Sequence, residues 1–436
     1  MTKKEPRIGN VVRYLVYVSP FVFPLYLLKF KILGIPFTAL EVFCYALFGF
    51  FLLSLAFGGA RLTWQKPLRY YWLAGFLLLL GATIGVLIAP HFIHLPSGEL
   101  LDAQKVALGV WKGWVVAPLL YFAAVTQVIR SEKETTFFIR LFVYSSALVA
   151  LAAYGFALFN GGITYDLRLS GFFESANYLS LYLVPPLLFS AMLILRRPEK
   201  LKWFDYFDLS SLAIMGHALF FTQSYAAIIA VFGALFLGFL WLMGRKRLAS
   251  RNGIIALCAM ALTFAVIVAT QVHTAKFRQF LDFKNRSSST VRLEIYEVAT
   301  SLIRENWLAG VGPGLFQANY QTKGPEILGH APMEWNIPHP HNIFFAFWLN
   351  SGLLGLIAFF ALIILAHRRF TYALVAFWGI VIHGLFDTPF WKNDLAMIFW
   401  LTLAVIVILQ TYGTHSPQKP AHPGGRRHLP SRPRRA

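Results

Sequence analysis

The chain has 436 residues, of which 57% are hydrophobic and 13% are charged. This composition is too apolar for a soluble protein and predicts an all-α protein that crosses a membrane many times. The formal net charge of +20 would suit a nucleic-acid-binding protein. Here, however, the basic residues lie mainly between apolar stretches, as the positive-inside rule expects of a membrane protein. We therefore expect the membrane as a partner and no nucleic acid.

Twelve apolar stretches are candidates for transmembrane helices, since a helix needs roughly 20 mainly apolar residues to cross a bilayer. They lie at about 11–28, 35–57, 70–89, 106–129, 138–159, 176–195, 208–223, 225–243, 253–272, 343–366, 370–386 and 394–411. The sequence thus predicts nine transmembrane helices within residues 1–272 and three within 343–412, with a long loop, 273–342, between them.

The Lys and Arg residues gather on alternate connections between these stretches. The positive-inside rule then places both chain ends in the cytoplasm and the loop 273–342 on the outer side of the membrane. The tail 413–436, rich in Pro, His, Gly and Arg, is expected to be a disordered, basic cytoplasmic segment. Both cysteines, Cys44 and Cys258, fall inside predicted helices and no metal-ligand spacing is present, so we expect neither a metal nor a cofactor.

Several polar groups outside the long loop are also expected to lie on the outer side of the membrane. Lys112 lies in the outer half of the fourth apolar stretch, where a cation costs roughly 2.5–3.5 kcal/mol on insertion scales. We expect it to face a polar cavity or an acidic partner. Arg168 in the loop 160–175, Ser224 and Tyr225 in a tight connection, and the segment 387–394 share this outer side and could contribute to one site.

The long loop contains a predicted amphipathic helix. Val291, Ile295, Val298 and Leu302 recur at the spacing of one helical face. Ser288, Ser289 and Thr290 can cap its start, and it should end near Asn306. We expect this helix to lie along the membrane surface. The run Gly310-Val311-Gly312-Pro313-Gly314 follows and predicts an irregular turn, which could also present backbone N–H groups to a phosphate.

The same loop is rich in cations, and arginine is suited to bind phosphate because its planar fork stays charged and donates in pairs. The candidates are Lys276, Arg278, Lys284, Arg286, Arg292 and Arg304. Each of these side chains could instead belong to a solvated face or touch lipid headgroups.

The loop ends with Pro338-His339-Pro340-His341-Asn342, nine residues before Gly352. Histidine, with an unperturbed pKa of about 6.5, is the usual general base near neutral pH. The alternative is structural: the prolines stiffen the start of a helix and Asn342 caps it. Gly352 and Gly355 are expected to permit close helix packing.

At this point the sequence resembles a known family. His341-Asn342, nine residues, Gly352, two residues and Gly355 are similar to the His-Asn-x9-Gly-x-x-Gly signature of the O-antigen ligase family, whose fold also includes O-antigen polymerases. Two further segments look like that family's motifs: Ser289–Arg292 with the run from Ile303 to Phe316, and Arg168–Phe173 continuing to Asn177.

The resemblance implies a GT-C-like fold in the bacterial inner (plasma) membrane and an extracytoplasmic active site. Such enzymes transfer a glycan from undecaprenyl pyrophosphate to a lipid or glycolipid acceptor, without metal and with inversion at the anomeric carbon. By this analogy His341 is the general base and Arg292 binds the pyrophosphate. The remaining substrate-binding candidates are Arg168, Arg278, Arg286, His339, Asn342 and Lys112.

One departure from the family leaves the reaction open. Ligases usually carry Ser-Arg at the outer end of a mid-chain helix, whereas the matching Thr222-Gln223-Ser224-Tyr225 has tyrosine at that place. An O-antigen-type polymerase that joins lipid-linked repeat units is the alternative within enzymes. A glycolipid transporter or a catalytically inactive assembly partner is the alternative outside them.

Overall fold

The structure is a computed structural model, and it describes residues 7–32, 35–60, 62–196, 202–248, 251–282 and 286–413. The predicted basic tail, apart from Gly413, lies outside the described residues, as does Lys284. The described chain is mostly helical, and its few strands form two small antiparallel hairpins.

The helices are α1 (Arg7–Val22), α2 (Ala39–Ala56), α3 (Lys66–Ile88), α4 (Ala103–Val110), α5 (Ala117–Val128), α6 (Glu132–Asn160), α7 (Ala176–Leu195), α8 (Trp203–Phe221), α9 (Tyr225–Leu248), α10 (Arg251–Gln271), α11 (Ala275–Leu281), α12 (Ser288–Glu305), α13 (Phe316–Leu328), α14 (Ile343–His367), α15 (Ala373–His383) and α16 (Asn393–Tyr412). A 3-10 helix, η1 (Phe23–Leu27), follows α1, and a π-helix, η2 (Trp111–Val116), joins α4 to α5. The hairpins pair β1 (Lys29–Ile32) with β2 (Ile35–Thr38), and β3 (Phe92–His94) with β4 (Leu100–Asp102).

Helix α16 lies at the centre of the bundle, with α3, α5, α6, α7 and α15 packed around it. Its sequence is apolar on all sides, as expected of a helix surrounded by protein. Phe399 and Trp400 are fully buried, and the ring of Phe399 contacts Phe347, Phe359 and Phe390. Such aromatic side chains bury large areas and dominate the energetics of a core.

Eight helices of the described residues are long and apolar enough to cross a membrane. They correspond to eight of the twelve predicted stretches; the remaining four fall on α8, α9, α10 and α15. A count of twelve spans is therefore not confirmed. In α8 the reason is chemical: Asp205 and Asp208 lower its hydropathy and pair with Arg140 of α6 at 3.5 and 3.0 Å.

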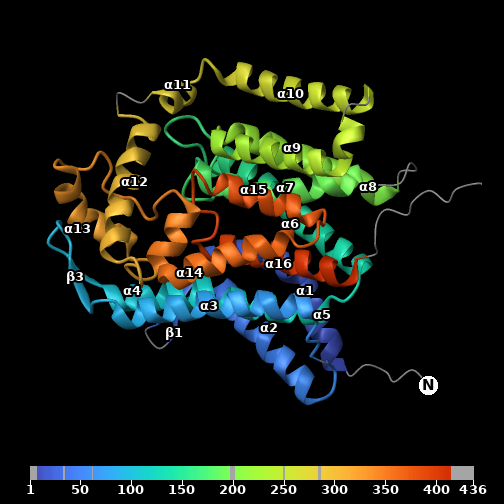
Figure 1. Cartoon of the computed structure of the whole chain (residues 1–436), viewed down its shortest axis with the longest axis horizontal. Helices are drawn as coiled ribbons and strands as arrows, with labels where there is room; N and C mark the ends of the chain where they lie inside the picture. The colour runs from blue at the N-terminus through green and yellow to red at the C-terminus, as the bar shows by residue number, and fades with distance from the viewer. Residues whose placement is uncertain are drawn as a thin grey trace, which may run out of the picture.

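The predicted outer loop forms a small folded unit at one end of the bundle. Figure 1 shows α11, α12 and α13 gathered there with the β3–β4 hairpin, while α1 begins at the opposite end. Helix α12 starts at Ser288, with Ser287 as its cap, and ends at Glu305.

The apolar face of α12 is buried against other helices. Ile295, Val298 and Leu302 are fully buried in a cluster with Phe316 and Tyr320 of α13 and with residues of α14. This face packs on α13 and α14, and the position of α12 along the membrane surface stays a prediction. The unit therefore has its own core, and α12 can serve as a rigid wall for a site.

Glycines determine how α14 packs. A Cβ atom at Gly81 of α3 would collide with the carbonyl of Ser351 and press on Gly355, so the two helices approach closely here, as expected for Gly355. Gly352 has a φ of +64° and breaks α14 into two parts. The glycine run after α12 packs on this break: Val311 N–H donates to the Leu349 carbonyl at 2.8 Å, and Gly314 N–H donates to Asn350 Oδ1 at 2.7 Å. The run is thus a turn that docks on α14.

Candidate functional site

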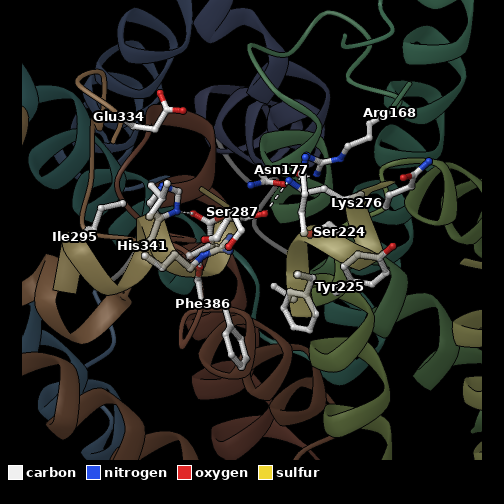
Figure 2. Close-up of a pocket in the computed structure, with 18 of the residues that line it drawn as sticks. Arg168, Asn177, Ser224, Tyr225, Lys276, Ser287, Ile295, Glu334, His341 and Phe386 are labelled. Atoms are coloured by element: carbon white, nitrogen blue, oxygen red, sulfur yellow. Dashed lines mark hydrogen bonds and ion pairs between the residues drawn. The ribbon is translucent and has the colours of Figure 1, made fainter. Parts of the chain in front are cut away.

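A cavity of about 450 Å³ opens between α7, α9, α11, α12 and the loops that precede α14 and follow α15. Figure 2 shows His341 on one side of it and Arg168 and Lys276 on the other. Its lining is rich in charged and polar side chains: Tyr165, Arg168, Asn177, Gln223, Ser224, Tyr225, Lys276, Gln279, Arg286, Ser287, Ser288, Arg292, Glu334, His341 and Asp387, with a few apolar neighbours.

His341 is held in the cavity wall by its backbone. Its φ of +47° is unusual for a residue with a side chain and costs about 1–3 kcal/mol, the kind of strain found at functional sites. The hydroxyl of Tyr296 donates to the His341 carbonyl at 3.0 Å. The next residue, Asn342, caps α14 by accepting from Phe344 N and Phe345 N at 2.9 and 3.2 Å. The structural role considered for Asn342 is therefore present, and it fixes where His341 lies.

Asp387 orients the imidazole of His341. Its Oδ1 lies 3.2 Å from Nδ1 of His341, and the carboxylate is almost fully buried in the loop after α15. Burial is the largest single influence and raises the pKa of Asp387, but His341, His339 and His383 together outweigh it and bring the pKa well below its usual range. An ionised carboxylate here selects the tautomer with the hydrogen on Nδ1, which leaves Nε2 of His341 able to accept a proton.

His339 lies behind this pair and does not line the cavity. Its Nδ1 is 3.1 Å from the Thr388 hydroxyl and 3.8 Å from Asp387 Oδ1, and its ring centroid is 4.4 Å from that of His341. Burial, together with the neighbouring His341, lowers the pKa of His339 to about 3. His339 is therefore neutral at physiological pH and supports the ring of His341 by packing.

Two arginines belong to the cavity wall. Arg168 is buried, and it donates from Nε to the Thr222 carbonyl at 2.6 Å and from Nη2 to Asn177 Oδ1 at 2.5 Å. Its Nη1 is 3.6 Å from Asp166. Arg292 of α12 donates from Nε to the Phe386 carbonyl at 3.2 Å, so it also fixes the loop that carries Asp387. These bonds hold both guanidinium groups at the cavity in fixed orientations.

Lys276 and Arg286 add two more cations. Lys276 of α11 donates from Nζ to Ser288 Oγ at 3.1 Å. Arg286 pairs with Glu334 at 2.8 Å, and both side chains are well exposed. A surface pair of this kind contributes little, so Arg286 marks the rim of the cavity.

The structure brings four of the eight predicted site residues to the cavity, namely His341, Arg292, Arg168 and Arg286. Arg278 points elsewhere and donates to the His273 carbonyl at 3.1 Å. Asn342 is used as a helix cap, and His339 lies behind His341. Lys112 has the acidic partner that we expected, since it forms an ion pair with Glu41 of α2, but this pair is not part of the cavity lining.

What sequence reasoning missed is the pairing of Asp387 with His341. The segment 387–394 was a candidate for the shared site, yet nothing in the spacing links Asp387 to His341, which is 46 positions earlier. The only sequence feature that marked Asp387 was its position, directly after a predicted helix on the outer side.

His339, His341 and Asp387 could also hold a cation, because one ligand atom from each lies within 4.8 Å of the others. Two imidazoles and a carboxylate are a ligand set that transition metals accept. In the structure, however, Asp387 already pairs with His341, and Thr388 contacts His339.

We expect a chelator such as EDTA to leave the activity of the purified protein unchanged, because Nδ1 of His341, when it carries a hydrogen toward Asp387, has no lone pair to offer a metal. The measurement is the activity before and after chelation, with Mn²⁺, Zn²⁺ or Mg²⁺ added back. A loss on chelation that one of these ions reverses would make the three residues a metal centre.

A comparison with protein families finds a match over a segment that contains several residues of the cavity. Residues 210–360 match the family model described as O-antigen ligase. The matched segment contains Lys276, Arg292 and His341, while Arg168 precedes it and Asp387 follows it. No curated protein matches the chain. Residues 210–360, which supply His341 and one wall of the cavity, are therefore similar to the O-antigen ligase family.

Proposed function

We propose that this protein transfers a glycan from undecaprenyl pyrophosphate to a hydroxyl group of a lipid or glycolipid acceptor. The observation that carries the proposal is the pairing of His341 with Asp387 at 3.2 Å on the wall of a cavity that also holds Arg168, Lys276 and Arg292. A base opposite a group of cations suits a reaction in which a hydroxyl attacks and a pyrophosphate leaves. The family match supports a membrane glycosyltransferase of the ligase or polymerase type.

In this mechanism the acceptor oxygen forms a bond to the anomeric carbon while the bond from that carbon to the pyrophosphate oxygen breaks. The bonding electrons leave with undecaprenyl pyrophosphate, and the hydroxyl proton passes to Nε2 of His341. Asp387 stabilises the imidazolium that results. Arg292 and Arg168 bind the pyrophosphate and offset the charge that grows on it. Attack opposite the leaving group inverts the anomeric carbon, and no metal takes part.

The proposal includes the location. The site faces outward from the bacterial inner membrane, with both chain ends in the cytoplasm, because the basic connections favour that orientation. Residues 273–342 would then form the extracytoplasmic catalytic loop between nine helices and three.

The alternatives make different predictions. Loss of a ligase leaves finished polymer on the lipid carrier, whereas loss of a polymerase leaves single repeat units on the acceptor. A transporter or an inactive assembly partner has no use for a carboxylate-oriented base, so the His341–Asp387 pair favours an enzyme.

The test is a transfer assay with purified protein, undecaprenyl-pyrophosphate glycan and acceptor. We expect Arg292→Ala to weaken transfer by about 10- to 150-fold, because a hydrogen bond to a charged group contributes about 1.5–3 kcal/mol. Arg304→Ala, on the exposed last turn of α12, is the matched control and should keep the wild-type rate. Wild-type kinetics for Arg292→Ala would exclude the pyrophosphate role, and no transfer by the wild type would exclude the proposed function.

A further inference from the structure

Lys276 is a cation of the cavity that neither the family motifs nor the mechanism above require. It lies in α11, a helix of seven residues that closes one side of the cavity, and Figure 2 shows its side chain close to Arg168. Among the described residues its ammonium group has one hydrogen bond, to Ser288 Oγ at 3.1 Å. An ammonium group has three donors, so Lys276 keeps capacity to bind an anion in the cavity.

Tyr225 explains why α11 sits there. Its hydroxyl lies 3.1 Å from Thr274 Oγ1, and its ring contacts the rings of Phe277 and Phe280 with centroids 5.5 and 5.3 Å apart. Thr274 in turn caps α11 by accepting from Phe277 N at 3.1 Å. The tyrosine at the place where ligases usually carry arginine thus anchors the helix that brings Lys276 to the cavity. Position 225 therefore carries no cation, and Lys276 of α11 supplies one to the cavity instead.

The charges around Lys276 are mainly of its own sign. Arg168, from the loop before α7, and Arg292, from α12, act on it as like charges, and Asp166 beside Arg168 acts as an opposing charge. Tyr225 of α9 lines the same cavity. The other charged groups of the cavity are Arg286, Glu334, His341 and Asp387. Burial, followed by Arg168, lowers the pKa of Lys276 to about 8; Asp166 acts against this shift, and Arg292 adds a smaller lowering effect.

We propose that Lys276 is a pyrophosphate-binding residue whose charge is completed by the ligand, so that the anion and a proton bind together. The two arginines that repel a proton from Lys276 are offset once a pyrophosphate lies between the three cations. The identity of the glycan donor rests on the proposed function. The binding of a pyrophosphate anion by Lys276 does not.

The sign of the pH dependence follows from linkage. Below about pH 8 the ammonium group is already charged in the empty cavity, and binding takes up no extra proton there. As the pH rises above that value, the empty site loses the proton but the occupied site retains it, so affinity falls with pH by up to about tenfold per unit. This fall continues until the pH reaches the raised pKa of Lys276 in the complex.

The experiment is calorimetric titration of the full-length protein in nanodiscs with inorganic pyrophosphate between pH 7 and 9.5. Buffers of different ionisation enthalpy report the protons taken up. Pyrophosphate itself binds protons in this range, so the quantity of interest is the difference between wild type and Lys276→Arg, which carries a charge at every pH tested. The matched control is Lys323→Met, which removes an exposed lysine of α13 that pairs with Glu305 of α12.

We expect wild type to take up close to one proton more than Lys276→Arg at pH 8.5 to 9, and Lys276→Met to bind pyrophosphate at least about tenfold more weakly at pH 7. The same proton uptake in wild type and Lys276→Arg, or unchanged affinity in Lys276→Met, would overturn the proposal. Pyrophosphate binding with this signature but no glycan transfer would instead contradict the proposed function alone.

Discussion

Replacing His341 by alanine is expected to lower the rate of glycan transfer by about 10²- to 10⁴-fold, the usual contribution of a general base. The structure supports an effect of this size because Nδ1 of His341 faces Asp387 at 3.2 Å and the ring lies in the cavity wall. The measurement is the single-turnover rate with undecaprenyl-pyrophosphate glycan, together with the donor affinity. We expect the rate to fall and the affinity to stay, since the cations that bind pyrophosphate are untouched.

Two neighbouring variants sharpen this test. Asp387→Asn should lose about 10²-fold in rate, because an amide neither selects the same tautomer nor stabilises the imidazolium. His339→Ala should lose much less, since His339 is buried, neutral and absent from the cavity lining. Full activity of His341→Ala, or equal losses for His339→Ala and His341→Ala, would show that the base has been misassigned.

The sequence predicted His341 as a site residue but not its pairing with Asp387. The spacing from His341 to Gly352 and Gly355 singled out His341, and of the two histidines His341 is the one that lines the cavity. The pairing of His341 with Asp387 could not be predicted from the sequence, because the two residues meet only when the loop before α14 packs on the end of α15. A hydrogen bond from the backbone N–H of Ile343 to the Gly384 carbonyl, at 2.7 Å, joins these two segments. Contacts between elements of this kind leave no periodic signal in the sequence.

The fold shows the same division. Apolar stretches predicted where the helices lie, because length and hydropathy are local properties of the chain. They could not tell which helices are surrounded by protein, and so they did not reveal that α16 is central. The spacing of Ile295, Val298 and Leu302 predicted an apolar face of α12, but a face of this kind does not specify whether lipid or protein covers it.

Lys112 illustrates how an intramembrane charge can be predicted to have a partner without its function being known. It lies in η2 and forms an ion pair with Glu41, whose other oxygen accepts from Asn393 Nδ2 at 2.9 Å. Asn393 in turn accepts from Trp114 Nε1 at 2.9 Å. The network joins α2, η2 and α16 inside the bundle. This arrangement accounts for Lys112 without a substrate.

Glu41→Ala is therefore expected to destabilise the protein by about 3–5 kcal/mol, because it leaves the ammonium group of Lys112 buried and unpaired. Removing both charges in Glu41→Ala/Lys112→Met should recover most of that loss, since an apolar pair of similar volume is tolerated where a single charge is not. Thermal unfolding in detergent measures the stability, and the transfer assay is run on the same samples. If Lys112 stabilises the bundle, the double variant is folded and active. A double variant that is folded but cannot transfer glycan would restore Lys112 as a substrate-binding residue and would require the donor to reach between α2 and η2.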